Sequence, residues 1–332
     1  LASPLLEDTV YVSRLAVDAP AYLTDHRVFD LPLFPGTGYL EVALAAVRLA
    51  LHSDQVMLAN VQIQEAMILP ETGERLVQTA VSPPQNGQST VRIFSQGENG
   101  KWQQHSTAVA HLKSAPLAEP EPLAAIQARC AERIEGVDYY RLLRDIGLGY
   151  GPAFRGIRAI QRRDGEALAE VTLPDDVSSK GYLIHPALLD ACFQVIGAAL
   201  PGLNDGASAN VYVPVGVSHF QLVQPGVTDL RCHAVVETGS GAAEALSGRV
   251  QLFDPAGQLV AVLDGIQLRR VSRMALQQVA KRPFADLIYH VTWHPTELPP
   301  AANSLDGHWL ILSDGAIGQT LAGAPGALTL EG

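Results

Sequence analysis

The sequence predicts an α+β protein in which two antiparallel sheets each wrap around a buried central helix and join to form one continuous sheet. Two segments, residues 39–51 and 186–200, are apolar on nearly every side, which is typical of helices in a protein interior. Each segment is followed by short runs with strand-like patterning. Because the order of loop, buried helix and strands occurs twice, we expect two similar halves that lie side by side.

Length, charge and cysteine content limit the class of protein. A chain of 332 residues with 47% hydrophobic content can form about two domains with substantial cores. The net charge of −11 disfavours nucleic acid and anionic membranes as partners, because both require clustered Lys and Arg. Three well-separated cysteines argue against a disulfide framework or a thiolate metal site and favour a cytoplasmic location. No apolar run is long enough to span a bilayer.

The first half is expected to comprise residues 1–115. Alternation predicts a strand within residues 5–17, and two prolines and two glycines predict a fixed loop over residues 22–39, before the first buried helix. Beyond residue 56, runs separated by Pro- and Gly-containing turns predict an antiparallel meander. The expected strands are residues 61–69, 76–81, 90–95 and 102–112.

A Pro-rich segment, residues 116–124, predicts a linker to the second half, which is expected to comprise residues 125–275. A tight turn over residues 147–155 precedes the second buried helix, which starts at Pro186 and is stopped by Pro201. The other elements expected in this half are helices at residues 123–133 and 138–146 and strands at residues 156–162, 167–173, 218–223, 230–237, 245–253 and 259–270.

The remaining residues, 276–332, have a different pattern. Residues 309–318 are typical of a buried strand that leads into a Gly-containing turn, as at the start of a nucleotide-binding βαβ unit. With no second strand and no cofactor-binding acid, this segment is too short for a dinucleotide site. The chain begins without Met and ends abruptly, so we expect it to be a piece of a longer protein.

The second buried helix carries two polar residues, Asp190 and Gln194, which lie four residues apart and therefore on one face. Burying a carboxylate costs several kcal/mol unless it is paired or protonated. Asp190 therefore either makes structural hydrogen bonds to nearby backbone or supplies a proton to a reaction. The sequence of the helix alone is compatible with both interpretations.

Three motifs, in this order and spacing, resemble the dehydratase domain of modular polyketide synthases. They are the segment from His26 through Asp30 to Pro35, the turn Gly149-Tyr150-Gly151-Pro152 with Phe154 two residues on, and the pair Asp190 and Gln194. The resemblance covers about residues 4–275 and implies a double hot-dog fold, in agreement with the two halves predicted above. The tail from about residue 283 resembles the first strand of the structural half of a ketoreductase.

The resemblance implies partners and a substrate. It implies that a 3-hydroxyacyl chain is carried on the phosphopantetheine arm of an acyl carrier protein, and that the chain works beside neighbouring polyketide synthase domains, as a homodimer. It implies no cofactor and no metal. It also implies supporting positions at Pro35, Gly36, Gly151 and Pro152.

The sequence departs from the family at Asp30, where the family has Gly. Asp is among the few residues that tolerate a positive φ, so the local backbone conformation can be kept. The substitution adds a negative charge four residues from His26, which can change the protonation or the position of that ring. We therefore retain Asp30 as a candidate supporting residue.

The chemistry of dehydration explains why these residue types are needed. The reaction removes a weakly acidic α-proton and expels a hydroxyl that leaves only as water, so it requires one base and one acid. Histidine suits the first task near neutral pH, and the resemblance gives that role to His26. A carboxyl in an apolar helix is suited to the second, and Gln194 can orient Asp190 by a hydrogen bond.

Two further groups have candidate roles. Backbone N–H groups at the start of the first buried helix can stabilise the negative charge that develops on the thioester oxygen, with Gly36 or Gly38 permitting close approach. The resemblance implies that Tyr150 hydrogen-bonds the β-hydroxyl or lines the pocket. A purely structural aromatic side chain in a Gly-Pro turn is the alternative for Tyr150.

Three functions are consistent with these residues. The first is a dehydratase that gives a 2-enoyl thioester, and the second is an isomerase or an oxygen-heterocycle-forming cyclase on the same fold. The third is a catalytically silent scaffold. A structural role is expected for five histidines whose spacing does not suggest a metal site, namely His52, His105, His111, His219 and His233. A capping role is expected for His185 at the start of its helix.

Overall fold

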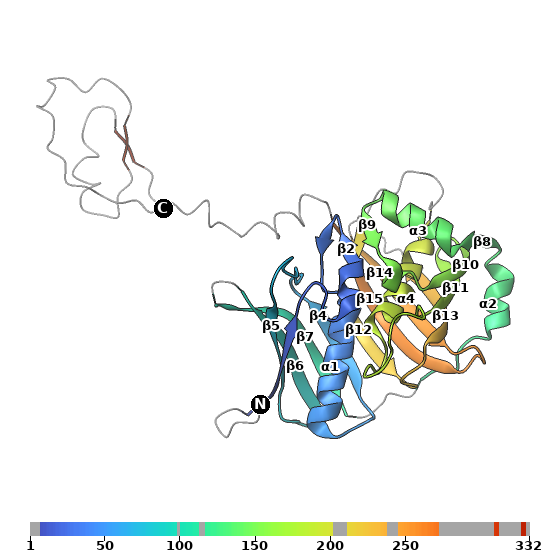
Figure 1. Cartoon of the computed structure of the whole chain (residues 1–332), viewed down its shortest axis with the longest axis horizontal. Helices are drawn as coiled ribbons and strands as arrows, with labels where there is room; N and C mark the ends of the chain where they lie inside the picture. The colour runs from blue at the N-terminus through green and yellow to red at the C-terminus, as the bar shows by residue number, and fades with distance from the viewer. Residues whose placement is uncertain are drawn as a thin grey trace, which may run out of the picture. The chain divides into compact units, whose positions relative to one another are not determined.

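The computed structural model describes residues 7–97, 100–112, 117–201, 211–237, 245–271, 309–311 and 327–329. The chain divides into two units, Leu1–Pro283 and Phe284–Gly332. In the first unit, twelve antiparallel strands form one curved sheet (Figure 1). This sheet confirms the predicted fold class.

The strands of the two halves follow one another across the sheet in the order β1-β5-β6-β7-β4-β12-β15-β14-β13-β11-β10-β8. The first half supplies β1 (Thr9–Leu15), β4 (Met57–Ile63), β5 (Arg75–Val81), β6 (Gln88–Gln96) and β7 (Trp102–His111). The second half supplies β8 (Glu132–Glu135), β10 (Ile157–Arg163), β11 (Glu166–Thr172), β12 (Val211–Leu222), β13 (Asp229–Glu237), β14 (Ala245–Phe253) and β15 (Leu259–Val271). The halves join where β4 pairs with β12, with Leu58 opposite Phe220.

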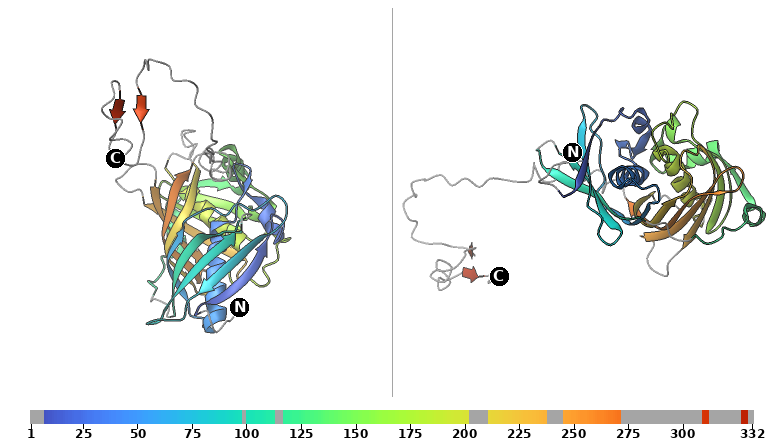
Figure 2. Two further views of the ribbon diagram at one scale, coloured as in Figure 1. Left: turned by 90° about the vertical axis from the view of Figure 1, so that its left-hand side faces the viewer. Right: turned by 90° about the horizontal axis from the view of Figure 1, so that it is seen from below.

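Two buried helices, α1 (Gly36–Leu51) and α4 (Pro186–Ala198), lie next to each other inside the curve of the sheet (Figure 2). Helix α1 packs on the strands of the first half and α4 on those of the second. Both helices bury most of their apolar side chains, such as Leu40 and Leu44 on α1 and Leu189 and Val195 on α4, whereas Leu49 near the end of α1 is exposed. One hydrophobic core therefore extends through both halves.

A second, three-stranded sheet connects the two halves near the helix starts. It contains β2 (His26–Val28), β3 (Leu31–Pro32) and β9 (Leu148–Tyr150). The short 3₁₀ helices η1 (Ala21–Asp25) and η2 (Pro152–Phe154) flank it. The fixed loop predicted over residues 22–39 thus contains short strands, which the sequence did not indicate, and His26 begins one that pairs with Tyr150.

Several predicted boundaries are also wrong, for identifiable reasons. Helix α2 (Leu123–Arg129) ends early because residues 132–135 form the edge strand β8, and α3 (Gly136–Asp145) follows directly. Strand β4 ends before the predicted residue 69, since Leu69 bonds to Pro32 instead. Strand β12 begins well before the predicted residue 218. It contains Pro214 next to a register shift, and proline obscures a strand pattern.

The second unit contains β16 (Trp309–Ile311) and β17 (Ala327–Thr329), which pair in parallel. Strand β16 matches the start of the predicted strand, whose remainder lies outside the described residues. The resemblance of this tail to a ketoreductase and the predicted domain limits stay predictions. Among the helices described, none is both long enough and apolar enough to cross a membrane.

Candidate active site

The ring of His26 is buried at the start of β2 and has a defined tautomer. Its Nδ1 lies 2.9 Å from the carbonyl oxygen of Leu33, which can only accept a hydrogen bond. Nδ1 therefore carries the hydrogen of the neutral ring, and Nε2 keeps a free lone pair. Nε2 lies 3.8 Å from Oδ1 of Asp190, which comes from the other half of the chain.

Asp190 is buried in the middle of α4, where only 5% of its surface is exposed. Burial raises the pKa of this carboxyl, while the nearby His26 and the hydrogen bond from Gln194 act in the opposite direction without cancelling the effect of burial. A carboxyl with a raised pKa keeps its proton to higher pH. Asp190 therefore has the property expected of a general acid.

Gln194 holds one side of this carboxyl. Its side-chain nitrogen donates to Oδ2 of Asp190 at 2.9 Å and to the carbonyl of Phe154 at 3.2 Å. The hydroxyl of Tyr139 donates to the backbone carbonyl of Gln194 at 2.7 Å. The contact predicted between Asp190 and Gln194 is thus present, and it leaves Oδ1 directed toward His26.

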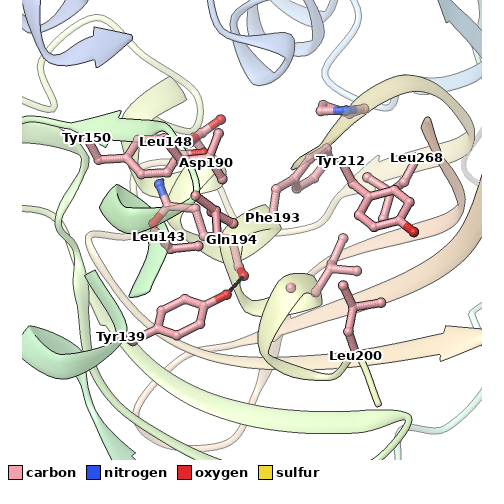
Figure 3. A pocket seen from close by; sticks show the side chains of 14 residues that line it. Tyr139, Leu143, Leu148, Tyr150, Asp190, Phe193, Gln194, Leu200, Tyr212 and Leu268 are labelled. Carbon is pink, nitrogen blue, oxygen red and sulfur yellow. Dashed lines mark hydrogen bonds between the residues drawn. The ribbon is translucent and has the colours of Figure 1, made fainter. Parts of the chain in front are cut away.

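Tyr150 and Phe154 enclose the imidazole from the second half. The ring centroids of Phe154 and Tyr150 lie 4.9 and 5.8 Å from that of His26. Burial raises the pKa of Tyr150 well above its usual value, so its hydroxyl stays protonated. Tyr150 also lines the same cavity as Asp190 and Gln194 (Figure 3).

The turn between β9 and η2 has a steric requirement for glycine. The N–H of Gly151 donates to the carbonyl of Asp25 at 2.7 Å, and a Cβ at this position would collide with the Asp25 carboxylate. That carboxylate accepts a hydrogen bond from the N–H of Ala153 at 2.8 Å. Pro152 then begins η2, which ends at Phe154. The motif residues Gly151 and Pro152 therefore place Phe154 against His26.

Pro35, Gly36 and Gly38 lie at the start of α1. Pro35 precedes the helix, and its carbonyl already accepts the N–H of Gly38 at 2.9 Å, so this N–H has a partner within the helix start. A Cβ on Gly36 would lie 2.9 Å from Cγ of Pro214, which lines the cavity. Gly36 is thus explained by close packing beside the cavity.

Asp30 is located away from the cavity. It has a φ of 70°, which confirms that Asp adopts the left-handed conformation expected at this position. The residue is exposed on the turn between β2 and β3, where its carbonyl accepts a hydrogen bond from Arg27 at 3.0 Å, whereas His26 is buried. The expected influence of Asp30 on the buried ring of His26 therefore stays a prediction.

The cavity beside Asp190 is mostly apolar, and Figure 3 shows Asp190, Tyr150 and Gln194 gathered at one side of it. Sequence reasoning missed most of its lining, because the contributing positions are adjacent only after the sheet has formed. The lining residues are Tyr139, Leu143, Ile146, Leu148, Tyr150, Asp190, Phe193, Gln194, Ile196, Gly197, Leu200, Tyr212, Pro214 and Leu268.

Other histidines have structural partners. Nδ1 of His185 accepts the N–H of Ala187 at 3.1 Å, which confirms the predicted cap of α4, and burial lowers the pKa of His185 to about 4. His105 lies 2.8 Å from the hydroxyl of Ser95, and His233 lies 2.7 Å from Glu166. Within the described ranges, no group of three His, Cys, Asp or Glu side chains is arranged to hold a metal ion.

Comparison with known proteins identifies the family. Residues 1–96 match the family described as "Polyketide synthase dehydratase domain", and residues 118–278 match "Polyketide synthase dehydratase N-terminal domain". A phenolphthiocerol/phthiocerol polyketide synthase of Mycobacterium tuberculosis is 32% identical over 325 residues, which are 93% of this chain and 17% of that protein. The chain thus spans about a sixth of the length of this relative.

Solved structures give the same result. The dehydratase domain from the CurF module of curacin polyketide synthase is 30% identical, with a TM-score of 0.74 over 82% of this chain and 96% of that one. The domain from the CurJ module is 27% identical, with a TM-score of 0.76 over 83% of this chain and 96% of that one. The sheet with its two buried helices is accordingly a double hot-dog fold, and the chain belongs to the polyketide synthase dehydratase domain family.

Proposed function

We propose that this domain removes water from a 3-hydroxyacyl thioester carried by an acyl carrier protein and gives the 2-enoyl thioester, with His26 as base and Asp190 as acid. The observation that carries this proposal is the 3.8 Å separation of His26 Nε2 and Asp190 Oδ1. The α-proton and the β-hydroxyl of the substrate are on adjacent carbons. One base and one acid this close together can reach both groups.

The base step follows from the tautomer of His26. The Leu33 carbonyl holds the Nδ1 hydrogen, so the lone pair of Nε2 is available for the α-proton. The rings of Phe154 and Tyr150 pack close to the imidazole, whose residue is 7% exposed, and limit access of water to it. As the C–H bond breaks, its electron pair forms the new C=C bond.

The acid step follows from the hydrogen bond of Gln194. Because Gln194 donates to Oδ2, that oxygen acts as an acceptor, and the carboxyl proton resides on Oδ1. Oδ1–H protonates the β-hydroxyl, the C–O bond breaks, and water leaves. The products are an imidazolium and a carboxylate, and transfer of one proton from His26 to Asp190 restores the starting state. The cycle has no net redox change, so we propose that it needs no cofactor.

The lining of the cavity is suited to an acyl substrate. Its lining is mostly apolar, and the hydroxyl of Tyr150 lies on the side that contains Asp190. We propose that Tyr150 hydrogen-bonds the β-hydroxyl and that N–H groups at the start of α1 face the thioester oxygen.

The proposed partners are an acyl carrier protein, neighbouring polyketide synthase domains and a second copy of this domain in a homodimer, in the cytoplasm. This proposal is supported by relatives that are polyketide synthases several times longer than the chain. For CurK dehydratase, a histidine-to-phenylalanine and an aspartate-to-asparagine variant are described as inactive mutants. Those descriptions support a His and Asp requirement within the family.

The decisive experiment follows a synthetic 3-hydroxyacyl thioester by mass spectrometry. The wild-type domain is expected to form a product lighter by one water, and His26→Ala is expected to form none. His52→Ala, which removes an exposed histidine at the end of α1, is the matched control and should retain full activity. A fully active His26→Ala variant would overturn the proposal. A dehydrated product that rearranges or cyclises without further mass change would reveal isomerase or cyclase activity.

A further inference from the structure

Glu41 is a buried carboxylate on α1 whose partners lie in the other half of the chain. Only 4% of its surface is exposed. Its Oε1 accepts the backbone N–H of Leu183 at 2.7 Å, and its Oε2 accepts that of Ile184 at 3.1 Å. Both donors come just before His185, the cap residue of α4. Glu41 therefore connects α1 to the chain that leads into α4.

Thr37 makes a parallel connection one turn earlier on α1. Its side chain is fully buried, and its hydroxyl donates to the carbonyl of Pro186, the first residue of α4, at 2.9 Å. Residues four apart on a helix lie on the same face, so Thr37 and Glu41 act together. Three hydrogen bonds thus attach this face of α1 to the start of α4.

These three hydrogen bonds connect the chain segments that hold the proposed base and the proposed acid. Helix α1 begins shortly after Leu33, whose carbonyl holds the ring of His26. Asp190 lies one turn after Pro186 on α4. We propose that Thr37 and Glu41 are positioning residues that set the separation of His26 and Asp190, an inference that rests on the proposed function of that pair.

The choice of polar residues at positions 37 and 41 supports a requirement for a defined position of α4 relative to α1. Burial raises the pKa of Glu41, which shows that the site disfavours the charge, and an apolar side chain would avoid this penalty. A carboxylate has two acceptor oxygens, and both are used for backbone groups near a helix start. Thr37 and Glu41 therefore fix the direction and the axial position of α4 in a way that apolar packing alone does not.

The first test is Glu41→Gln. The amide oxygen can accept only one of the two N–H groups, and the amide nitrogen would face the other donor. The start of α4 should shift, and kcat with a synthetic 3-hydroxyacyl thioester should fall about tenfold or more with KM changed less than about twofold. Val47→Ala is the matched control, since it removes buried volume from α1 beyond this contact. It should lower the melting temperature and leave kcat unchanged.

The second test uses a conservative pair at Thr37. Thr37→Ser keeps the hydroxyl and should retain kcat, whereas Thr37→Val keeps the shape, removes the hydrogen bond and should lower kcat. Because both substitutions are small, both variants should fold even if Glu41→Gln does not. Equal kcat values for Thr37→Val and Thr37→Ser would overturn the inference.

A pH profile separates positioning from general stability. The titratable groups that interact electrostatically with Asp190 are His26 on β2, Tyr150 on β9 and Tyr140 on α3, together with Cys192 on α4 itself. The pKa of Asp190 depends on its burial and on its contacts with His26 and Gln194, so a shift of the start of α4 should move the alkaline limb of kcat.

The outcomes are distinct from a failure of the proposed function. Unchanged kcat and an unchanged alkaline limb in Glu41→Gln and Thr37→Val, with only a lower melting temperature, would show that these residues stabilise the fold and nothing more. That result would leave the roles of His26 and Asp190 intact. Activity in His26→Ala would instead overturn the catalytic pair itself.

Discussion

The side-chain nitrogen of Gln194 lies 2.9 Å from Oδ2 of Asp190, one turn earlier on the same helix, and the same nitrogen reaches the carbonyl of Phe154 at 3.2 Å. Phe154 belongs to the turn that packs against His26. One amide group therefore links the proposed acid to the segment that encloses the proposed base. We therefore expect Gln194 to contribute to the reaction by orienting Asp190.

Gln194→Leu should lower kcat about tenfold, because the carboxyl of Asp190 loses the contact that orients Oδ1. The same hydrogen bond lowers the pKa of Asp190, so its loss should raise that pKa and move the alkaline limb of kcat to higher pH. The measurement is kcat from pH 5 to pH 10 with a synthetic thioester. An alkaline limb that moves to lower pH would contradict the assignment of Gln194.

The two proposed catalytic residues should behave as one unit. Removing either His26 or Asp190 prevents the coupled transfer of two protons, so His26→Ala and Asp190→Asn should each lower kcat by about a thousandfold or more. The double variant should be scarcely slower than either single variant, because the second substitution removes a group that can no longer act. Rate losses that multiply in the double variant would show independent roles.

The protonation of Asp190 should also appear in the stability of the fold. The pKa of Asp190 is raised in the folded state, so its contribution to stability is fully present below its unfolded pKa and is lost as pH rises through the folded pKa. In Asp190→Asn this loss should be absent. The unfolding free energies of wild type and Asp190→Asn should therefore diverge as pH rises. The total divergence should be about 1.4 kcal/mol for each tenfold difference in the proton affinity of Asp190 between the folded and unfolded states.

Urea unfolding from pH 4 to pH 9 tests this expectation. Wild type should lose stability relative to Asp190→Asn as pH rises. Asp138→Asn, at an exposed site on α3, should follow the wild-type curve. Parallel curves for Asp190→Asn and wild type would show that Asp190 is charged throughout this range.

The sequence predicted those parts of the fold that depend on local chemistry. Both buried helices were found because their apolar character continues around the whole helix, and Asp190 was notable because it interrupts one of them. The positive φ of Asp30 agrees with the expectation drawn from the glycine that the family has at this position and from the tolerance of Asp for this conformation. The continuous sheet followed from the repeated order of elements.

Features that depend on long-range contacts could not be predicted. No local pattern shows that β2 pairs with β9 and so brings Tyr150 to His26, because those strands are only three residues long. The bonds of Glu41 to residues in the other half have no signal in the spacing of either segment. The start of β12 was missed because Pro214 interrupts its pattern, although Tyr212 and Pro214 line the cavity.

The last prediction concerns α2 and the outer face of the sheet. Glu166 on β11 accepts hydrogen bonds from Arg129 of α2, His233 of β13 and Arg163 of β10. These contacts lower the pKa of Glu166 to about 2, so its contribution to stability is present above the unfolded pKa and lost as pH falls toward 2.

Glu166→Gln should therefore lower the melting temperature at pH 7, and its difference from wild type should shrink progressively between pH 5 and pH 2. Glu170→Gln on the same strand, where Arg231 lies 3.5 Å away, provides the exposed control and should have little effect. A difference between Glu166→Gln and wild type that stays constant over this pH range would mean that the stabilising contacts do not depend on the charge of Glu166.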